Sequence, residues 1–453
     1  MIVVSHRGPV SFRRDGEHFR ASRGAGGLVS VLSPLLAQND SARWYAAALS
    51  DDDRAAVAAG RAEVPEFRLQ LLNLDPDLHR QHYDVIANEL LWFLHHGLFD
   101  LPNTPRLDRA TRLAWDAYVE VNRAFAAAVA EDAGEHDTVL VQDFQLALVP
   151  GVLRDLRPDL RIAAFTHIPF CGPNSIRVLP EVMATTLLGT MRRTPVGFHT
   201  ARWARAYRAS AAEVLGGAPD VPTFASAFCP DLDGLRAEAA TAPVREAVGG
   251  FDALAGDRQL IVRSDRIEPS KNIVRGLLAF ETLLEERPEW RERTVLAALV
   301  NPSRERLPIY LRLRREVEEV VERINDRWAR GDWTPVILDA RDDYARSLAG
   351  LARADVLLVN PIRDGLNLVA KEGPVVNERD APLCLSRDAG AFDELGGACV
   401  EVQPYDLLQT ASALHTALAM GPAERTARAS ALRDRIGARR PVDWLGDQLT
   451  HAR

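Results

Sequence analysis

The sequence predicts an α/β protein built from two successive Rossmann-like lobes. Short apolar strands alternate with longer amphipathic segments along most of the chain, a pattern typical of helices layered on a mostly parallel sheet. The alternation begins again near residue 230. Several of the predicted strands end on polar residues, and ligands of such sheets bind at the carboxyl ends of the strands.

The first series of elements starts at the N-terminus. Residues 2–5 (Ile-Val-Val-Ser) predict a strand, and a Gly-rich loop at 23–27 precedes a helix that starts at Leu28. Further strands are predicted over 138–141, 161–166 and 195–198. The first two of these run into Asp143 and His167.

The second series repeats the pattern. Strands are predicted over 259–264, 294–300, 334–338 and 356–359, with helices over 273–286 and 307–324. An Ala/Gly-rich stretch at 237–256 lies near the junction. We therefore expect a first domain over 1–229, a second over 230–435, and a segment over 436–453 that returns to the first domain.

The composition is that of an ordinary globular protein. Of 453 residues, 47% are apolar and 26% charged, and the net charge of -8 argues against nucleic acid as a partner. The four cysteines (Cys171, Cys229, Cys384, Cys399) show no C-x-x-C spacing, which fits a reducing cytoplasm and offers no zinc site. The first residues (Met-Ile-Val-Val-Ser-His-Arg) show neither the charged n-region nor the long apolar h-region expected of a signal peptide, and no apolar run reaches the roughly 20 residues that span a bilayer. We expect a cytoplasmic protein with no membrane partner.

Lysine is nearly absent from the chain. Only Lys271 and Lys371 occur among the 55 basic side chains, and both lie in motif-like stretches. A coding bias towards arginine explains the depletion but not these two positions. Lysine is a compact point charge, whereas arginine is a planar fork that favours bidentate partners. We interpret Lys271 as functional, while chance retention explains Lys371 equally well.

Arg266 and Lys271 follow the predicted strand 259–264. Two fixed cations at this spacing can flank a diphosphate and stabilise the negative charge that builds on a leaving group. The alternative is a surface Arg and Lys in a turn.

The longest motif is Arg-Asp-Gly-Leu-Asn-Leu-Val-Ala-Lys-Glu at 363–372, after the strand 356–359. Gly365 permits a tight turn, and a helix is predicted from Leu366, so its first amides can bind an anion. Asp364 could accept hydrogen bonds from sugar hydroxyls and Glu372 from ribose hydroxyls. The alternative is an ordinary strand–turn–helix in which the aspartate serves the turn.

Asp143 and His167 each follow a predicted strand, so their side chains are expected to converge on one edge of the sheet. Weaker candidates for an anion site are Arg7, Tyr83, Trp92 and Arg304, and Trp92 could equally belong to the core. Three D-x-D patterns, at 51–53, 75–77 and 231–233, follow no convincing strand. We interpret them as loop carboxylates and not as metal ligands.

Taken in order, the motifs resemble those of the trehalose-6-phosphate synthase family of retaining glycosyltransferases over about residues 1–420. They are Ser-His-Arg (5–7), Gly-Gly-Leu (26–28), Trp-Asp-x-Tyr-x3-Asn (115–122), Val-Gln-Asp (141–143), His-Ile-Pro-Phe (167–170), Gly-Phe-His-Thr (197–200), Arg266 with Lys271, Arg-Ile-Asn (323–325), Trp-Thr-Pro (333–335) and the run at 363–372.

The resemblance implies the GT-B architecture, in which two Rossmann-like lobes face a central cleft. It also implies transfer of glucose from a nucleoside diphosphate in the second domain to carbon 1 of glucose-6-phosphate in the first. For the acceptor, the resemblance implies that Asp143 contacts the sugar and that the phosphate is bound by Arg7, Tyr83, Trp92 and Arg304. For the donor, it implies that His167 and Asp364 contact the glucose, Arg266 and Lys271 bind the diphosphate, and Glu372 binds the ribose. The backbone amides of Asn367, Leu368 and Val369 would lie near the donor sugar, and Gly26 and Gly27 would belong to a loop that closes over the ligands. The expected catalytic residues are Asp143, His167, Arg266, Lys271 and Asp364. No metal or other cofactor is expected, because two cations and the helix-start amides take that place.

The chain departs from the family pattern in ways that bear on the donor. The second Trp of a Trp-x-Gly-Trp element is missing after Trp44, residues 268–272 read Glu-Pro-Ser-Lys-Asn in place of Asp-Tyr-Ser-Lys-Gly, and Tyr344 replaces an arginine often found beside the nucleobase. The stretch 373–380 resembles instead the pseudo-glycosyltransferases of validamycin-type biosynthesis, which use a GDP-linked donor. We therefore expect GDP-glucose as the donor.

Three other functions stay open. The nearest is a pseudo-glycosyltransferase that joins a GDP-cyclitol to an amino-cyclitol phosphate, although the intact acceptor set and the complete 363–372 motif favour the sugar enzyme. The others are a nucleotide-sugar-binding regulator without turnover and a nucleotide-sugar epimerase, which would not need the acceptor-phosphate residues. The expected partners are small-molecule substrates, with a homo-oligomer also possible.

Overall fold

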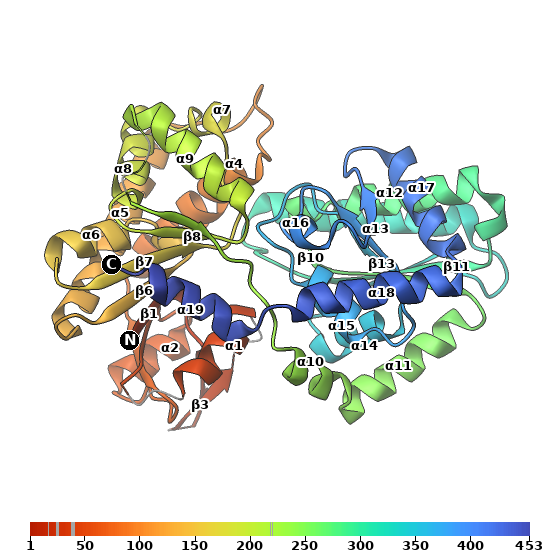
Figure 1. The fold of residues 1–453 in the computed structure, drawn as a ribbon, viewed down its shortest axis with the longest axis horizontal. Helices are drawn as coiled ribbons and strands as arrows, with labels where there is room; N and C mark the ends of the chain where they lie inside the picture. Colours follow the sequence, from red (N-terminus) through yellow and green to blue (C-terminus); the bar gives the residue numbers. More distant parts are fainter. Residues whose placement is uncertain (17, 24–26, 38–40, 218, 220) are drawn as a thin grey trace. The chain divides into compact units, whose positions relative to one another are not determined.

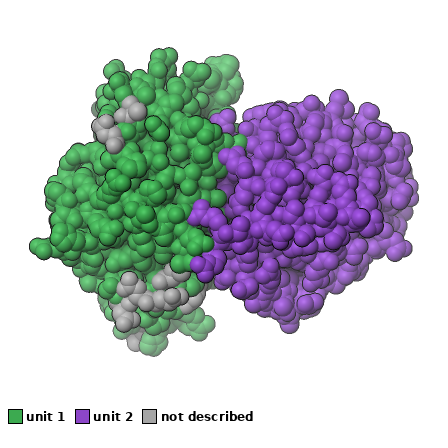
Figure 2. Space-filling view, viewed as in Figure 1, with its two compact units in different colours: residues 1–228, 441–453 green, residues 229–440 purple. Residues whose placement is uncertain are grey.

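The computed structural model describes residues 1–453 apart from 17, 24–26, 38–40, 218 and 220. It divides into two compact units, coloured separately in Figure 2: unit 1 is Met1–Phe228 with Pro441–Arg453, and unit 2 is Cys229–Arg440. The boundary expected at 435/436 falls inside helix α18 (Pro422–Gly437). The chain passes back to unit 1 only after Arg440, where Pro441 begins helix α19 (Pro441–His451).

Unit 1 is a parallel sheet with helices around it. Its seven strands run in the order β5-β4-β1-β6-β7-β8-β9, and all their pairings are parallel. The strands are β1 (Ile2–Arg7), β4 (Arg43–Ala47), β5 (Arg68–Leu72), β6 (Thr138–Gln142), β7 (Arg161–Thr166), β8 (Val196–Phe198) and β9 (Thr223–Ala225). The helical segments are α1 (Gly27–Leu36), α2 (Asp51–Ala58), α3 (Pro76–Arg80), the π-helix η1 (Gln81–Leu91), α4 (Trp92–His96), α5 (Arg109–Asp132), η2 (Phe144–Leu146), α6 (Val149–Leu156), α7 (Pro173–Ile176), α8 (Glu181–Met191), α9 (Ala201–Leu215) and α19.

Unit 2 repeats this plan with a six-stranded parallel sheet in the order β12-β11-β10-β13-β14-β15. Its strands are β10 (Gln259–Arg266), β11 (Thr294–Asn301), β12 (Val336–Asp339), β13 (Val356–Val359), β14 (Leu383–Ser386) and β15 (Val400–Val402). Its helical segments are α10 (Leu232–Ala239), α11 (Ala242–Ala255), η3 (Pro269–Lys271), α12 (Ile273–Glu286), η4 (Pro288–Trp290), α13 (Pro308–Trp328), α14 (Tyr344–Arg353), α15 (Val369–Val376), α16 (Phe392–Leu395), α17 (Leu407–Ala419) and α18. The predicted α/β class with two Rossmann-like lobes is confirmed.

Each sheet contains a point at which the strand order reverses. In unit 1 the chain builds outward from β1 to β4 and β5 on one side, and from β6 to β9 on the other. In unit 2 it builds from β10 to β11 and β12, and from β13 to β15. The carboxyl ends of strands that flank such a switch point form the usual ligand site of an open α/β sheet. The strand ends that matter are therefore those of β1 and β6, and those of β10 and β13.

The strands are apolar because helices cover the sheet, as in other parallel sheets. In unit 1, Val4, Val141 and Ile162 of three neighbouring strands pack with Phe125 on α5 and Leu153 on α6, and all five are 1% exposed or less. Burying a side chain of this size contributes about 1.5–3 kcal/mol. This packing fixes the strands whose ends carry the candidate site.

Several elements differ from the prediction. The antiparallel hairpin of β2 (Val10–Asp15) and β3 (His18–Arg23) was not expected, since its exposed face is polar and its strands are short. The Ala/Gly-rich stretch at 237–256 forms the end of α10 and all of α11. The helix expected from Leu366 begins at Val369, because Asn367 has a positive φ of 78°, which a right-handed helix does not allow.

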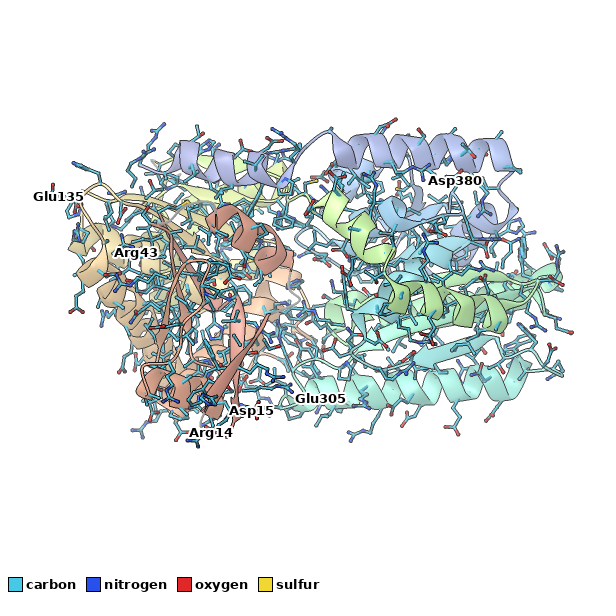
Figure 3. The ribbon with its side chains drawn as sticks, turned by 90° about the horizontal axis from the view of Figure 1, so that it is seen from below. Arg14, Asp15, Arg43, Glu135, Glu305 and Asp380 are labelled. Carbon is cyan, nitrogen blue, oxygen red and sulfur yellow. The ribbon has the colours of Figure 1, made fainter. Side chains whose placement is uncertain are left out.

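Polar anchors and the C-terminal helix complete the two units. Arg43, labelled in Figure 3, starts β4 and donates to the carbonyl of Asp132 and to the carboxylate of Asp137. In unit 2, Asp380, also labelled, accepts from Thr426 and Arg433 of α18 at 2.8 and 2.9 Å. Helix α19 packs along β6 and β7 of unit 1 (Figure 1).

Among the described residues, no helix is both long enough and apolar enough to cross a membrane.

Candidate functional site

Asp143 follows β6, at the switch point of unit 1. Its backbone has φ 74° and ψ 167°, a conformation that strains any residue with a Cβ by about 1–3 kcal/mol. Two hydrogen bonds hold it there. Its N–H donates to the carbonyl of Phe165 at 2.7 Å, and its Oδ1 accepts from the N–H of His167 at 3.0 Å. The structure therefore brings Asp143 and His167 together, with the carboxylate fixed by strain and hydrogen bonding.

The imidazole of His167 is held from both sides. Its Nδ1 lies 3.2 Å from Nε2 of His199, and its Nε2 lies 3.1 Å from Oε1 of Gln142. Burial lowers the pKa of His167, and the neighbouring Asp143 carboxylate offsets this only in part. The ring is therefore neutral at pH 7, and it can donate or accept but carries no charge.

The expected acceptor-phosphate residues of unit 1 have different surroundings. Arg7 ends β1 and is exposed, next to His6. Tyr83, on η1, stacks on the His6 ring with centroids 4.4 Å apart and planes 6° apart. Trp92 begins α4 and is only 3% exposed, so its ring lies largely in the core. The stacking thus places Tyr83 beside the end of β1. The burial of Trp92, by contrast, is explained by packing alone.

Lys271 ends the turn η3, which follows β10 in unit 2. Its Nζ lies 2.5 Å from Oδ2 of Asp364, which follows β13, and Nδ2 of Asn367 donates to the same oxygen at 3.2 Å. Burial disfavours the ammonium, but the carboxylates of Asp364, Asp265 and Glu268 together raise the pKa of Lys271 above its ordinary value. The side chain is therefore a permanent cation at the switch point.

Glu268 lies between the two expected phosphate arginines. This carboxylate is 1% exposed, and its Oε1 lies 3.1 Å from Arg266 and 3.9 Å from Arg304, which comes from the loop after β11. Ser303 Oγ donates to the same oxygen at 3.1 Å. Burial raises the pKa of Glu268, but Arg266, Arg304 and Lys271 outweigh it and bring the pKa down to about 2. The buried anion thus pairs directly with Arg266, whereas Arg304 is held mainly by Tyr310, to whose hydroxyl its Nη1 donates at 2.6 Å.

A buried arginine anchors the loop that carries Lys271. Arg263 on β10 is fully buried and donates to Oδ2 of Asp265 at 2.7 Å and to the carbonyl of Lys271 at 2.9 Å. A Cβ at Gly276 of α12 would come within 2.3 Å of Arg263 Nη1, so this helix position leaves room for the guanidinium. The backbone that presents Lys271 is therefore tied to the sheet.

Helix α15 carries the remaining donor candidates. Leu368 caps it and Val369 begins it, and Oδ1 of Asn367 accepts from the N–H of Ala370 at 3.1 Å. Burial raises the pKa of Glu372, in the first turn, to about 7. Burial and then the charge of Glu372 raise the pKa of Tyr344 to about 12, which puts the two side chains near one another.

Some predictions on the site fall outside these clusters. Gly26 lies outside the described residues, and Gly27 is the first residue of α1. The three D-x-D patterns are not in loops: Asp51–Asp53 form the first turn of α2, while Asp75 and Asp231 cap α3 and α10. Carboxylates there stabilise helix starts. No group of three His, Cys, Asp or Glu side chains within the described ranges has metal-binding geometry.

Four residues of these clusters had no predicted role: Glu268, Arg263, Gln142 and His199. The sequence did hold signals for them. Glu268 lies inside the motif of Arg266 and Lys271, Arg263 is a charge within an otherwise apolar strand, and Gln142 and His199 belong to motifs of the family pattern. Their partners come from other parts of the chain, and these contacts could not be read from spacing.

The chain matches known proteins along its whole length. Residues 1–452 match the model for glycosyltransferase family 20. The trehalose-6-phosphate synthase of Mycolicibacterium smegmatis is 33% identical, over 98% of this chain and 90% of that protein. The validamine 7-phosphate valienyltransferase of Streptomyces hygroscopicus subsp. jinggangensis is 32% identical, over 99% of this chain and 93% of that protein. The UDP-forming α,α-trehalose-phosphate synthase A of Dictyostelium discoideum is also 32% identical, and this chain spans only 58% of its length.

Solved structures agree. A UDP-forming α,α-trehalose-phosphate synthase from Burkholderia vietnamiensis superposes with a TM-score of 0.83 at 28% identity, covering 99% of both chains. One from Burkholderia xenovorans, in complex with glucose-6-phosphate, gives 0.84 at 27% identity and covers 99% of this chain and 98% of that one.

Proposed function

This chain belongs to glycosyltransferase family 20 and is a glycosyltransferase, and we propose that it moves glucose from a nucleoside diphosphate to glucose-6-phosphate, giving α,α-trehalose-6-phosphate. The relatives that carry this activity in their names match nearly all of this chain. The proposed roles of individual residues come from the geometry of each unit.

The observation that carries the proposal is the group of cations after β10 and β11. Arg266 and Arg304 lie 3.1 and 3.9 Å from the buried carboxylate of Glu268, while Lys271 is paired with Asp364 and is close enough to Glu268 to lower its pKa. Three cations thus face these two carboxylates. Such a group retains a net positive charge, and its side chains are held by hydrogen bonds before any ligand arrives. Preorganised charge of this kind stabilises a departing diphosphate most effectively.

The proposed chemistry retains the configuration at the anomeric carbon. The bond between glucose carbon 1 and the diphosphate oxygen breaks, and a bond from carbon 1 to the acceptor hydroxyl oxygen forms on the same face. The hydroxyl proton passes to the departing phosphate oxygen. Lys271 and Arg266 stabilise the charge on that oxygen, and Asp364 orients the donor sugar.

We propose GDP-glucose as the donor, on the ground that Tyr344 replaces the arginine usual beside the base. Tyr344 is 47% exposed, so its ring is available to a base. The stretch 373–380 gives no such support. Asn377 is engaged with three carbonyls of α14 and its end, and Asp380 with α18. Several relatives are named as UDP-forming, so UDP-glucose is the competing donor.

A donor-by-acceptor matrix tests the proposal. Purified protein is incubated with GDP-, ADP- or UDP-glucose and with or without glucose-6-phosphate, and release of nucleoside diphosphate is followed together with the disaccharide phosphate. We expect product only when glucose-6-phosphate is present, and fastest with GDP-glucose. Preference for UDP-glucose would overturn the base assignment alone, whereas no disaccharide with any donor would overturn the function.

A second candidate function has its own support. The valienyltransferase is as similar to this chain as most of the named synthases, over 99% of the chain. Its name gives a cyclitol phosphate as acceptor and a valienyl group as the group transferred, and the resemblance of the stretch 373–380 implies a GDP-linked donor. Adding validamine 7-phosphate and GDP-valienol to the same matrix decides between the two, because the better substrate pair has the higher kcat/KM.

A further inference from the structure

Around His167, donors and acceptors of unit 1 form one continuous series of hydrogen bonds. The N–H of Phe228 points at Nδ1 of His199, at 3.4 Å. His199 Nε2 lies 3.2 Å from His167 Nδ1, and His167 Nε2 lies 3.1 Å from Gln142 Oε1. Gln142 Nε2 then donates to Oε1 of Gln448 on α19, at 2.9 Å.

The first hydrogen bond of the series determines which atom donates in each of the others. A backbone N–H can only donate, so Nδ1 of His199 must be the bare nitrogen of a neutral ring. The proton of His199 is then on Nε2, and it is donated to Nδ1 of His167. That nitrogen is bare in turn, so His167 carries its proton on Nε2 and donates it to Gln142 Oε1.

We propose that His199 and Gln142 are positioning residues that fix the orientation of His167, the residue expected to contact the donor sugar, and hold its ring as the neutral Nε2–H tautomer. The N–H is held by the Oε1 of Gln142, a side chain that is only 1% exposed. An orientation set by two partners is the usual means by which a protein chooses a histidine tautomer. The sugar in this statement rests on the proposed function, whereas the tautomer does not.

The surroundings of the ring favour this arrangement. Trp444 of α19 packs against it with ring centroids 5.8 Å apart, and Phe165 lies at 5.0 Å. The carboxylate of Asp143 accepts from the backbone N–H of His167 and not from its ring. Burial lowers the pKa of His167, in keeping with a neutral imidazole.

The first test is spectroscopic and needs no substrate. Long-range proton–nitrogen correlation spectra of 15N-histidine-labelled protein distinguish the two neutral tautomers and the imidazolium. The signals of His167 are assigned by their absence in His167→Asn. We expect the Nε2–H form at pH 7.5 in the wild type, and a mixture of tautomers in His199→Leu. The Nδ1–H form or the imidazolium in the wild type would overturn the proposal, even if transfer activity is as proposed.

The second test uses turnover and a rescue. His199→Leu should lower kcat by about ten-fold or more, since small misplacements of a group that touches substrate are costly, while KM for glucose-6-phosphate changes less than two-fold. His199→Gln should recover most of kcat, because an amide can accept from Phe228 and donate to His167. His415→Leu is the control; His415 accepts from Trp290 in unit 2, and its loss should leave kcat unchanged.

Thermal unfolding separates positioning from folding. If His199→Leu and His199→Gln are equally stable but only the glutamine variant turns over, the positioning role stands. If both lose activity in proportion to stability, or if neither loses activity, the role is overturned. A wild type that gives no disaccharide at all would remove the proposed function but leave the tautomer result valid.

Discussion

Lys271 and Lys371, the two lysines of the chain, lie in different surroundings. Lys271 is a partly accessible cation at the ends of β10 and β13, paired with Asp364. Lys371 is 1% exposed, and its Nζ lies 2.6 Å from Oε2 of Glu394 on α16. A compact ammonium suits both positions, but only the first can meet a ligand phosphate.

Replacing the two lysines should therefore differ in its effect on turnover. Lys271→Met should lower kcat by about 10²–10³, because one donor to the departing phosphate is lost, and it should also destabilise by about 1–3 kcal/mol, because Asp364 loses its ion-pair partner. Lys371→Met should mainly destabilise, by about 1–3 kcal/mol, because it leaves Glu394 without its buried partner. Initial rates and thermal unfolding of both variants check this. Near-normal turnover in Lys271→Met would refute the role given to that side chain.

Glu268→Gln tests whether one buried carboxylate serves both substrates. The amide keeps the shape but removes the negative charge that lies 3.1 Å from Arg266 and 3.9 Å from Arg304. KM for donor and for acceptor should each rise about ten-fold, which corresponds to about 1.4 kcal/mol for each substrate. Steady-state kinetics with each substrate varied in turn gives the two values. A rise confined to one substrate would show that Glu268 serves a single arginine.

At the scale of elements, the end of β6 combines strain with function. Asp143 has a φ of 74°, which glycine adopts without cost. Asp143→Ala and Asp143→Gly both lose the hydrogen bond to the His167 N–H, but only alanine keeps the Cβ strain. The glycine variant should therefore be more stable than the alanine variant by about 1–2 kcal/mol, while both lose activity. Chemical denaturation gives the difference, and equal stability would mean that the backbone relaxes.

The first turn of α15 predicts a pH dependence of nucleotide binding. Burial raises the pKa of Glu372 to about 7. If the carboxylate accepts from the ribose, then affinity should fall by up to about ten-fold per unit as pH drops below 7. Glu372→Gln supplies a neutral acceptor and should flatten this part of the profile, which also controls for titration of the nucleotide. Calorimetric titration with nucleoside diphosphate from pH 5.5 to 8.5 measures both.

The raised pKa of Glu372 also makes the stability of the fold depend on pH. The unfolded chain ionises Glu372 near the ordinary value of 4.5, so between about 4.5 and 7 the folded state binds more protons than the unfolded state. The contribution of Glu372 to stability is therefore lost as pH rises through this window. Glu372→Gln should lack this contribution to the slope.

At the scale of the molecule, the chain builds two sheets on one plan and completes the first with its last helix. Trp444 of α19 is fully buried in unit 1, Leu445 is 6% exposed, and the N–H of Ile162 donates to the carbonyl of Arg453 at 3.0 Å. The segment 441–453 is thus part of the unit 1 core although it follows the whole of unit 2 in sequence.

Trp444→Ala should lower the stability of unit 1 by about 3–5 kcal/mol, as other large-to-small core substitutions do. Hydrogen exchange should accelerate in β6 and β7 but not in β10 to β13. Val442→Ala, at a side chain 44% exposed, is the control and should change stability by less than about 0.5 kcal/mol. Unchanged exchange in β6 and β7 would mean that α19 adds little to the unit it packs on.

The sequence by itself determined the fold class and most strand positions, and it predicted the residues of a candidate site. Alternating apolar and amphipathic segments report burial locally, and polar residues at strand ends converge because parallel strands share one carboxyl edge. Strand 356–359 and helix 273–286 were therefore predicted with the bounds that the structure gives. Local patterns could not show the positive φ of Asp143, because a residue with a Cβ keeps that conformation only where contacts from the rest of the fold enforce it.

Only the tertiary structure decided which polar groups meet. Gln142 and Gln448 are bonded across 306 positions of sequence, Lys271 and Asp364 across 93, and Glu268 holds an arginine from another loop. A buried charge or amide must find its partners wherever the fold brings them, because leaving it unsatisfied costs more than most contacts contribute. That requirement acts through space and not along the chain, so it placed His199, Gln142 and Glu268 beside the predicted residues without a signal in their spacing.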